Sequence, residues 1–352
     1  MNKVRLLILP CLLLVAALCS AQSTQMNLPR QSQRAQLTQR IGITDISIVY
    51  SRPLVNGRKI WGGLVPYGQV WRAGANENTI ITFPNDVTVE GKPLAAGTYG
   101  LHMIPGENEW TVIFLKMHTA WGSFTYKESE DALRVSVKPQ ATEFHNALTY
   151  DFDQLQPDSS VLVMSWDKVA VPVKMSVDVN KIVEASLNNQ LRGLSQYTWD
   201  GWDDAATYLV DNKVDLNEAL KWENNSIANE DRYDNEMTKY RILKAMGQDT
   251  EAQQAKDKAL ALANAQQLYG YGRQLQREKK QDEAFNIYKE AAQKYPDNWL
   301  SHAGLARVAC GEGNYSEAAK QMQLALAGAP DGAKQGVQSL VTKLQAKQDI
   351  NQ

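Results

Sequence analysis

The sequence predicts two parts, an N-terminal antiparallel β-sandwich or barrel and a C-terminal α-solenoid. Between about residues 40 and 180, short runs of alternating apolar and polar residues are separated by turn signals, which is typical of antiparallel strands. Beyond residue 180 the apolar residues follow the helical period and alanine becomes frequent. Small residues then recur 34 positions apart, a spacing that indicates stacked helix pairs.

About nine strands fit into the β part. The first alternates Ile46, Ile48 and Tyr50 with more polar neighbours, and turn residues follow most of the others. The remaining strand-like runs are residues 79–83, 87–89, 97–104, 110–115, 133–137, 147–152, 161–166 and 169–177. No stretch between them has the helical length that a parallel crossover would need, so we expect an antiparallel sandwich or barrel over residues 40–180.

The helical part contains two matching segments. Five positions correspond at a spacing of 34 residues: Gly272, Ala284, Tyr288, Ala291 and Pro296 align with Ala306, Ala318, Met322, Ala325 and Pro330. The small residues allow close helix packing, and each proline ends a helix. This pattern resembles the tetratricopeptide repeat, with copies at residues 265–298 and 299–332. Two irregular helix pairs precede them, which extends the predicted array to residues 199–332.

Segments on either side complete the predicted organisation of the helical part. Residues 181–198 are expected to form a linker or connecting helix, and residues 333–352 a capping helix and tail. An array of this kind needs about three stacked units, because one helix pair cannot bury its own apolar face.

The first 21 residues have the pattern of a secretory signal peptide. Lys3 and Arg5 precede the apolar run at residues 6–18, and Cys19 to Ala21 form a small-x-small cleavage site. Lipid attachment at Cys19 is disfavoured because a leucine precedes it. We therefore expect an exported protein, periplasmic or extracellular, that is soluble after cleavage and begins with an N-terminal segment at residues 22–39. No later segment reaches the ~18 apolar residues of a membrane span.

Charge and cysteine content exclude some classes of protein. The formal net charge is −2, so there is no basic excess for nucleic acid. After cleavage Cys310 is the one remaining cysteine, which leaves no intramolecular disulfide. None of the four histidines has metal-ligand spacing, and we predict no metal or cofactor.

The densest polar motif of the β part is residues 70–77. It contains Trp71, Arg72, Asn76 and Glu77 around a glycine. A guanidinium, an amide and a carboxylate can bind a polar ligand, and an indole can stack on a sugar. The alternative is that these side chains brace a long loop from within.

Two residues outside this motif complete the candidate ligand site. Arg52 either joins Arg72 at one site or braces the loop. His102 lies on the strand predicted at residues 97–104. The carboxylates between Glu128 and Asp131 are interpreted as a solvated turn.

Several strings in this region resemble an exported bacterial family called domain of unknown function 2911. They are residues 51–53, 57–68, 71–77, 96–101 and 121–124, within a resemblance that covers about residues 30–178. The resemblance implies an exported protein, often from Bacteroidota, and no established activity.

The function predicted from these features is non-catalytic binding or scaffolding. No Gly-x-Ser-x-Gly elbow and no mature Cys–His pattern is present, and no catalytic residue is assigned. The helical repeats would present a surface to a protein or peptide, while the β domain would bind a small ligand or glycan. The alternative is an envelope enzyme, a hydrolase or isomerase, with a site around Arg72, Asn76 and Glu77, in which Arg72 orients the substrate and Glu77 acts as acid or base.

Overall fold

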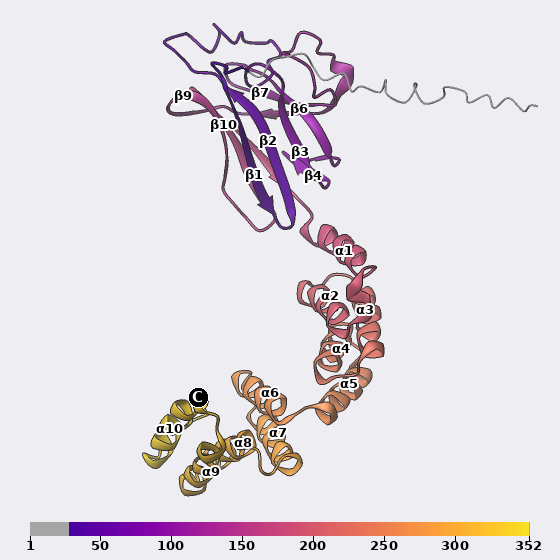
Figure 1. Cartoon of the computed structure of the whole chain (residues 1–352), viewed down its shortest axis with the longest axis vertical. Helices are drawn as coiled ribbons and strands as arrows, with labels where there is room; N and C mark the ends of the chain where they lie inside the picture. Colours follow the sequence, from indigo (N-terminus) through magenta and orange to yellow (C-terminus); the bar gives the residue numbers. More distant parts are fainter. Residues whose placement is uncertain (1–27, 352) are drawn as a thin grey trace, which may run out of the picture. The chain divides into compact units, whose positions relative to one another are not determined.

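The computed structural model describes residues 28–351, and the chain divides into two compact units between Val179 and Asn180. The predicted signal peptide lies outside the described residues. Antiparallel strands β1–β10 come first, and helices α1–α10 follow (Figure 1). The predicted fold class is confirmed, with the strands forming two open sheets and no closed barrel.

The β unit consists of a six-stranded and a four-stranded sheet, in which every pairing is antiparallel. The larger sheet has the order β1 (Gln33–Ile41), β2 (Thr44–Arg52), β3 (Thr79–Phe83), β6 (Gly97–Ile104), β7 (Trp110–Leu115) and β8 (Asp131–Val137). The smaller sheet has the order β5 (Lys92–Leu94), β4 (Val87–Val89), β10 (Ser159–Ser176) and β9 (Gln140–Asp153).

Four strands differ clearly from the sequence prediction: β1 and β5 were not expected, β9 begins at Gln140 instead of residue 147, and β10 joins two expected strands. β1 begins at Gln33, before the expected start of the β part, and its side chains are mostly exposed because it is an edge strand. The runs 161–166 and 169–177 belong to one long strand, β10, whose register against β9 shifts on either side of Asp167. Asp167 has a positive φ of 55°, so the local irregularity interrupts the alternation without ending the strand.

Aromatic side chains join the two sheets. Trp61 contacts Trp110 of the larger sheet and Trp166 of the smaller one, with ring centroids 4.8 and 5.7 Å away. Tyr50 on β2 meets Tyr150 on β9 edge-to-face at 4.8 Å. Each such pair contributes about 0.5–1.5 kcal/mol beyond the burial of its area, so this cluster fixes how the sheets face each other.

The helical unit is a succession of helix pairs (Figure 1). The helices are α1 (Val179–Gln190), α2 (Trp199–Asn212), α3 (Leu216–Asn229), α4 (Tyr233–Ala245), α5 (Asp249–Leu262), α6 (Ala265–Arg277), α7 (Gln281–Lys294), α8 (Trp299–Gly311), α9 (Tyr315–Gly328) and α10 (Asp331–Gln345), with short 3₁₀ turns η1 (Glu128–Glu130) and η2 (Leu194–Tyr197) elsewhere in the chain. None of the helices in the described residues is long and apolar enough to cross a membrane.

Close helix packing explains the small residues of the repeats. Tyr288 on α7 is fully buried, and a Cβ atom placed on Gly272 would lie 2.4 Å from its ring. A Cβ on Gly304 of α8 would lie 2.9 Å from the same ring. The ring therefore fits between α6 and α8 only because both neighbours lack a side chain.

We expect opposite effects from adding one methyl group at two glycines of α6. Gly272→Ala should lower the free energy of unfolding by about 1–3 kcal/mol, because the new Cβ overlaps the Tyr288 ring. Gly270→Ala should leave stability unchanged or raise it by up to about 1 kcal/mol, because its Cβ meets nothing within 4 Å and alanine favours the helix. Urea unfolding of both variants measures the difference, and equal effects would contradict this packing.

Candidate functional site

The six residues of the predicted ligand site enter different environments. Trp71 belongs to the core between the sheets: its ring stacks on Trp166 at 5.9 Å and contacts Trp61 at 5.7 Å. Its indole N–H donates to the carbonyl of Gly74 at 3.1 Å. Because neighbouring rings cover the indole, the structure does not support the idea that Trp71 stacks on a ligand.

Three of the predicted site residues brace the fold. Arg52 Nε donates to the carbonyl of Leu148 on β9 at 2.9 Å. Asn76 donates to the carbonyl of Ser32 at 3.3 Å, and Glu77 forms an ion pair with Arg30 at 2.5 Å. Asn76 and Glu77 therefore hold the segment before β1, where they line a cleft of 390 Å³.

The ion pair affects the protonation of Glu77. Partial burial acts to raise the pKa of this carboxyl, but hydrogen bonds from its own backbone N–H and from Arg30 outweigh burial, and the pKa is lowered overall. Glu77 is therefore ionised at neutral pH and a poor proton donor.

Arg72 and His102 lie side by side. Trp71 and Met103 exchange two backbone hydrogen bonds of 2.8 Å as an antiparallel pair, so the residues next to them, Arg72 and His102, project together from the opposite face of the sheet. His102 pairs with Ile113 on β7, and Ile113 pairs with Arg134 on β8. Because paired residues project from the same face of a sheet, Arg134 lies on the same face as His102.

The loop between β7 and β8 covers this face. Lys116 and Glu130 close it with a backbone hydrogen bond of 3.0 Å, and the backbone N–H of Asn78 donates to Ala120 in the loop at 3.1 Å. A Cβ on Gly100 would lie 2.7 Å from the carbonyl oxygen of Met117, so the glycine is what lets the loop approach the sheet.

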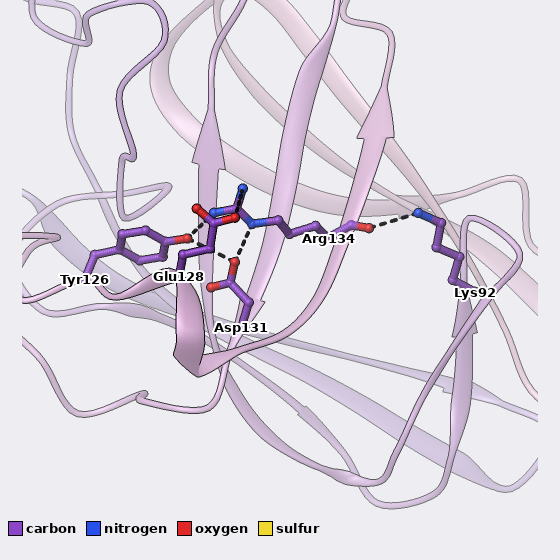
Figure 2. Close-up of polar contacts among 5 residues, drawn as sticks. All are labelled: Lys92, Tyr126, Glu128, Asp131 and Arg134. Atoms are coloured by element: carbon purple, nitrogen blue, oxygen red, sulfur yellow. Dashed lines mark hydrogen bonds and ion pairs between the residues drawn. The ribbon is translucent and has the colours of Figure 1, made fainter.

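We call Arg72, His102, Tyr126, Asp131 and Arg134 the outer-face cluster. Tyr126 donates to Asp131 at 3.0 Å, and Arg134 donates to both of them (Figure 2). The side chain of Asp131 is only 9% exposed, so this carboxylate belongs to a partly buried ion pair, whereas Glu128 is 76% exposed, as a solvated turn requires. The sequence pattern of β8 could not predict the burial of Asp131, because one of its partners, Tyr126, lies in the loop and the other, Arg134, lies on the strand.

The outer-face cluster contains buried polar atoms that lack a partner. His102 is 1% exposed and its Nδ1 has none, and Nε of Arg72 and Oδ1 of Asp131 are also unpaired. Burial lowers the pKa of both His102 and Arg72. For His102, hydrogen bonds to the backbone of Gly100 and Gly122 and the charge of Asp131 act against burial without outweighing it. A buried polar atom without a partner costs about 1–3 kcal/mol, which makes these atoms candidates for ligand contact.

The helical unit contains an open pocket of 480 Å³ along the first helices of three successive pairs. Asp203 on α2, Tyr233 and Asp234 on α4, and Tyr271 on α6 are among its lining residues. The sequence did not single them out, because their helices are irregularly spaced and no short motif links them.

Another part of the repeat face is occupied by the chain itself. The segment after α10 folds back so that Arg307 donates to the carbonyl of Ile350, and Gln276 donates to Asn351 at 2.8 Å. The thiol of Cys310 donates to Asp349 at 3.4 Å. This segment contacts α6 and α8, whereas the pocket lies across α2, α4 and α6.

No metal site is formed by the side chains described, because within residues 28–351 no group of three or more His, Cys, Asp or Glu residues is suitably arranged.

The comparisons with known proteins match one part of the β unit and one part of the helical unit. Residues 32–175 match the family model described as protein of unknown function (DUF2911), and residues 275–344 match a tetratricopeptide repeat model. Both resemblances noted in the sequence are confirmed, in the predicted order. The repeat match supports a helical region for protein interaction.

One similar solved structure is titled "Crystal structure of YrrB: a TPR protein with an unusual peptide-binding site". It is 14% identical, with a TM-score of 0.28, over 46% of this chain and 82% of that chain. No curated protein matches.

Proposed function

We propose that this chain is an exported, non-catalytic binding protein that holds a protein or peptide in the open pocket of its helical repeats. The observation that carries the proposal is the 480 Å³ pocket along α2, α4 and α6. It combines tyrosine rings with charged and amide groups, a mixture that suits a peptide with both apolar and polar side chains. The tetratricopeptide match over residues 275–344 supports a protein-binding role for the helical unit as a whole. The N-terminal sequence pattern supports export to the periplasm or the cell exterior.

An envelope enzyme is the weaker proposal. It would use Arg72, Asn76 and Glu77 in one site, yet Asn76 and Glu77 are both engaged with the segment before β1. The lowered pKa of Glu77, which Arg30 helps to maintain against burial, also disfavours proton donation.

Filling the pocket should abolish peptide binding. We would select peptides from a display library on residues 22–352 and measure their affinity by fluorescence anisotropy. Gln274 is exposed and lines the pocket, so Gln274→Trp should raise Kd at least about tenfold by excluding the peptide. Gln253 is equally exposed on α5 outside this pocket, and Gln253→Trp should change Kd less than about twofold. Failure to select binders, or equal binding by both variants, would contradict the proposal.

The β unit offers a second binding function, for a small anionic ligand such as an acidic glycan. Arg72 is half-buried beside His102, and within residues 28–351 no acceptor for its guanidinium is found. A carboxylate or phosphate would supply that acceptor with a planar, bidentate geometry.

Anionic ligands should stabilise the β unit through Arg72. In thermal unfolding of residues 22–352, a panel of sugar acids and sugar phosphates should contain compounds that raise Tm, and Arg72→Gln should lose that increase. Arg34 is exposed on β1, so Arg34→Gln should keep it. If no anion raises the Tm of the unsubstituted protein more than that of Arg72→Gln, the β-unit proposal is wrong.

A further inference from the structure

The chemistry of the repeat pocket indicates which side chain its partner presents, an inference that rests on the proposed peptide-binding function. The pocket is lined by cationic and anionic groups from α2, α4, α6 and the turn after α6. Some of these charges are neutralised by ion pairs within the chain. The charges that remain determine the charge that a ligand must carry.

Both cations that line the pocket are already paired. Arg241 donates to Asp211 on α2, and Lys280 forms an ion pair with Glu278 at 2.8 Å. Lys256 lies behind the pocket wall, 5.6 Å from the centre of the Tyr271 ring, and pairs with Glu283 at 3.6 Å. These three cations are therefore compensated without a ligand.

Two carboxylates of the pocket are left without a cation. Asp203 and Asp234 have no ion-pair partner in the part of the chain that the structure describes. Asp234 accepts one hydrogen bond of 3.2 Å from the neutral amide of Gln267. Oδ1 of Asp203 is buried and meets no donor. After internal pairing, the pocket keeps an excess of negative charge.

Glu223 on α3 lies behind Asp203 and adds an independent observation. Its exposed fraction is 0%, and neither of its carboxyl oxygens has a donor from the surrounding residues. Burial first, and the charge of Asp203 second, raise its pKa to about 9, so it holds a proton at neutral pH and donates it toward Asp203.

The other charged groups near this pair do not compensate it. Glu236 on α4 adds negative charge and is held by Lys258 on α5, with an Nζ–Oε1 distance of 2.6 Å. The charge of Lys239 on α4 lowers the pKa of Glu223 in part, but within residues 28–351 neither carboxyl oxygen of Glu223 has a hydrogen-bond partner. Burial raises the pKa of Asp203, side-chain hydrogen bonds with Thr238 and Glu223 act against burial, and the charges of Asp204 and Asp234 raise the pKa further. Buried carboxyls are usually accompanied by a cation, and here a proton takes that place.

We propose that the pocket receives a lysine or arginine side chain of a basic protein segment, which forms ion pairs with Asp203 and Asp234. Tyr233 and Tyr271 line the same pocket and offer aromatic surface to the aliphatic stem of such a side chain. A cation close to Asp203 also supplies the charge that the Asp203–Glu223 pair lacks.

The peptides selected on residues 22–352 provide the test. They should share a lysine or arginine at a fixed position, and replacing it by norleucine should raise Kd about tenfold or more. Asp203→Asn and Asp234→Asn should each weaken the basic peptide by about tenfold. Both variants should bind the norleucine peptide with the same Kd as the unsubstituted protein, because the norleucine peptide already lacks the ion pair that the substitutions remove. Asp282 is exposed on α7, and Asp282→Asn should leave all affinities unchanged.

The outcomes separate this inference from the proposed function. Peptides that Gln274→Trp excludes, but that carry no shared basic residue or bind both aspartate variants normally, would overturn the cationic pocket and leave peptide binding intact. Peptides that bind Gln274→Trp as tightly as the unsubstituted protein would overturn both the proposed peptide binding in the pocket and the recognition of a basic side chain. Thermal unfolding identifies any variant that fails to fold, and Asp234→Asn is the safer of the two because an asparagine oxygen can still accept from Gln267.

Discussion

Close approach between helices is the constraint on which the helical unit depends. The ring of Tyr288 fills the space between α6 and α8, and a Cβ on either Gly272 or Gly304 would lie less than 3.0 Å from it. Alanines at 284, 291, 306, 318 and 325 are buried in the same way. With small residues at the contacts, successive pairs bury a continuous apolar core, and the first helices of the pairs are free to line a binding surface.

The polar groups of that surface are not arranged for stability alone. Within residues 28–351 Asp203 and Glu223 have no ion-pair partner, although Glu236 close to them is held by Lys258. Such an arrangement costs free energy in the unbound protein. A basic partner would recover part of that cost on binding, so the same pair links the stability of α2–α4 to the chemistry of recognition.

The sequence predicted the parts of the fold that local patterns determine. The 34-residue spacing identified the repeats because each contact is set by one small residue, and alternation identified most strands. The polar edge strand β1 was not predicted, because exposed strands carry little apolar pattern. For the β site, Arg72 and His102 were selected and do lie together, whereas Trp71 is in the core and Asn76 and Glu77 hold the segment before β1.

The sites that the sequence did not predict depend on distant residues. Arg134 and Tyr126 join His102 through strand register and loop closure, and neither is encoded in a short motif. Asp203 and Glu223 are 20 positions apart on different helices, and each alone resembles an ordinary helix-surface carboxylate. Only the packing of α3 against α2 shows that one of them is fully buried.

Proton release on binding tests the central claim most directly. In the free protein the pKa of Glu223 is about 9, through burial and the neighbouring Asp203, so the pair is protonated at pH 7. A cation beside the pair favours the ionised form and lowers this pKa, so binding near the pKa should release a fraction of a proton. Calorimetric titrations at pH 9, where Glu223 is still partly protonated in the free protein, measure that fraction in buffers of different ionisation enthalpy. The predicted result is proton release when the basic peptide binds the unsubstituted protein, and no proton release when it binds Glu223→Gln. Absence of proton release from the unsubstituted protein would contradict the account.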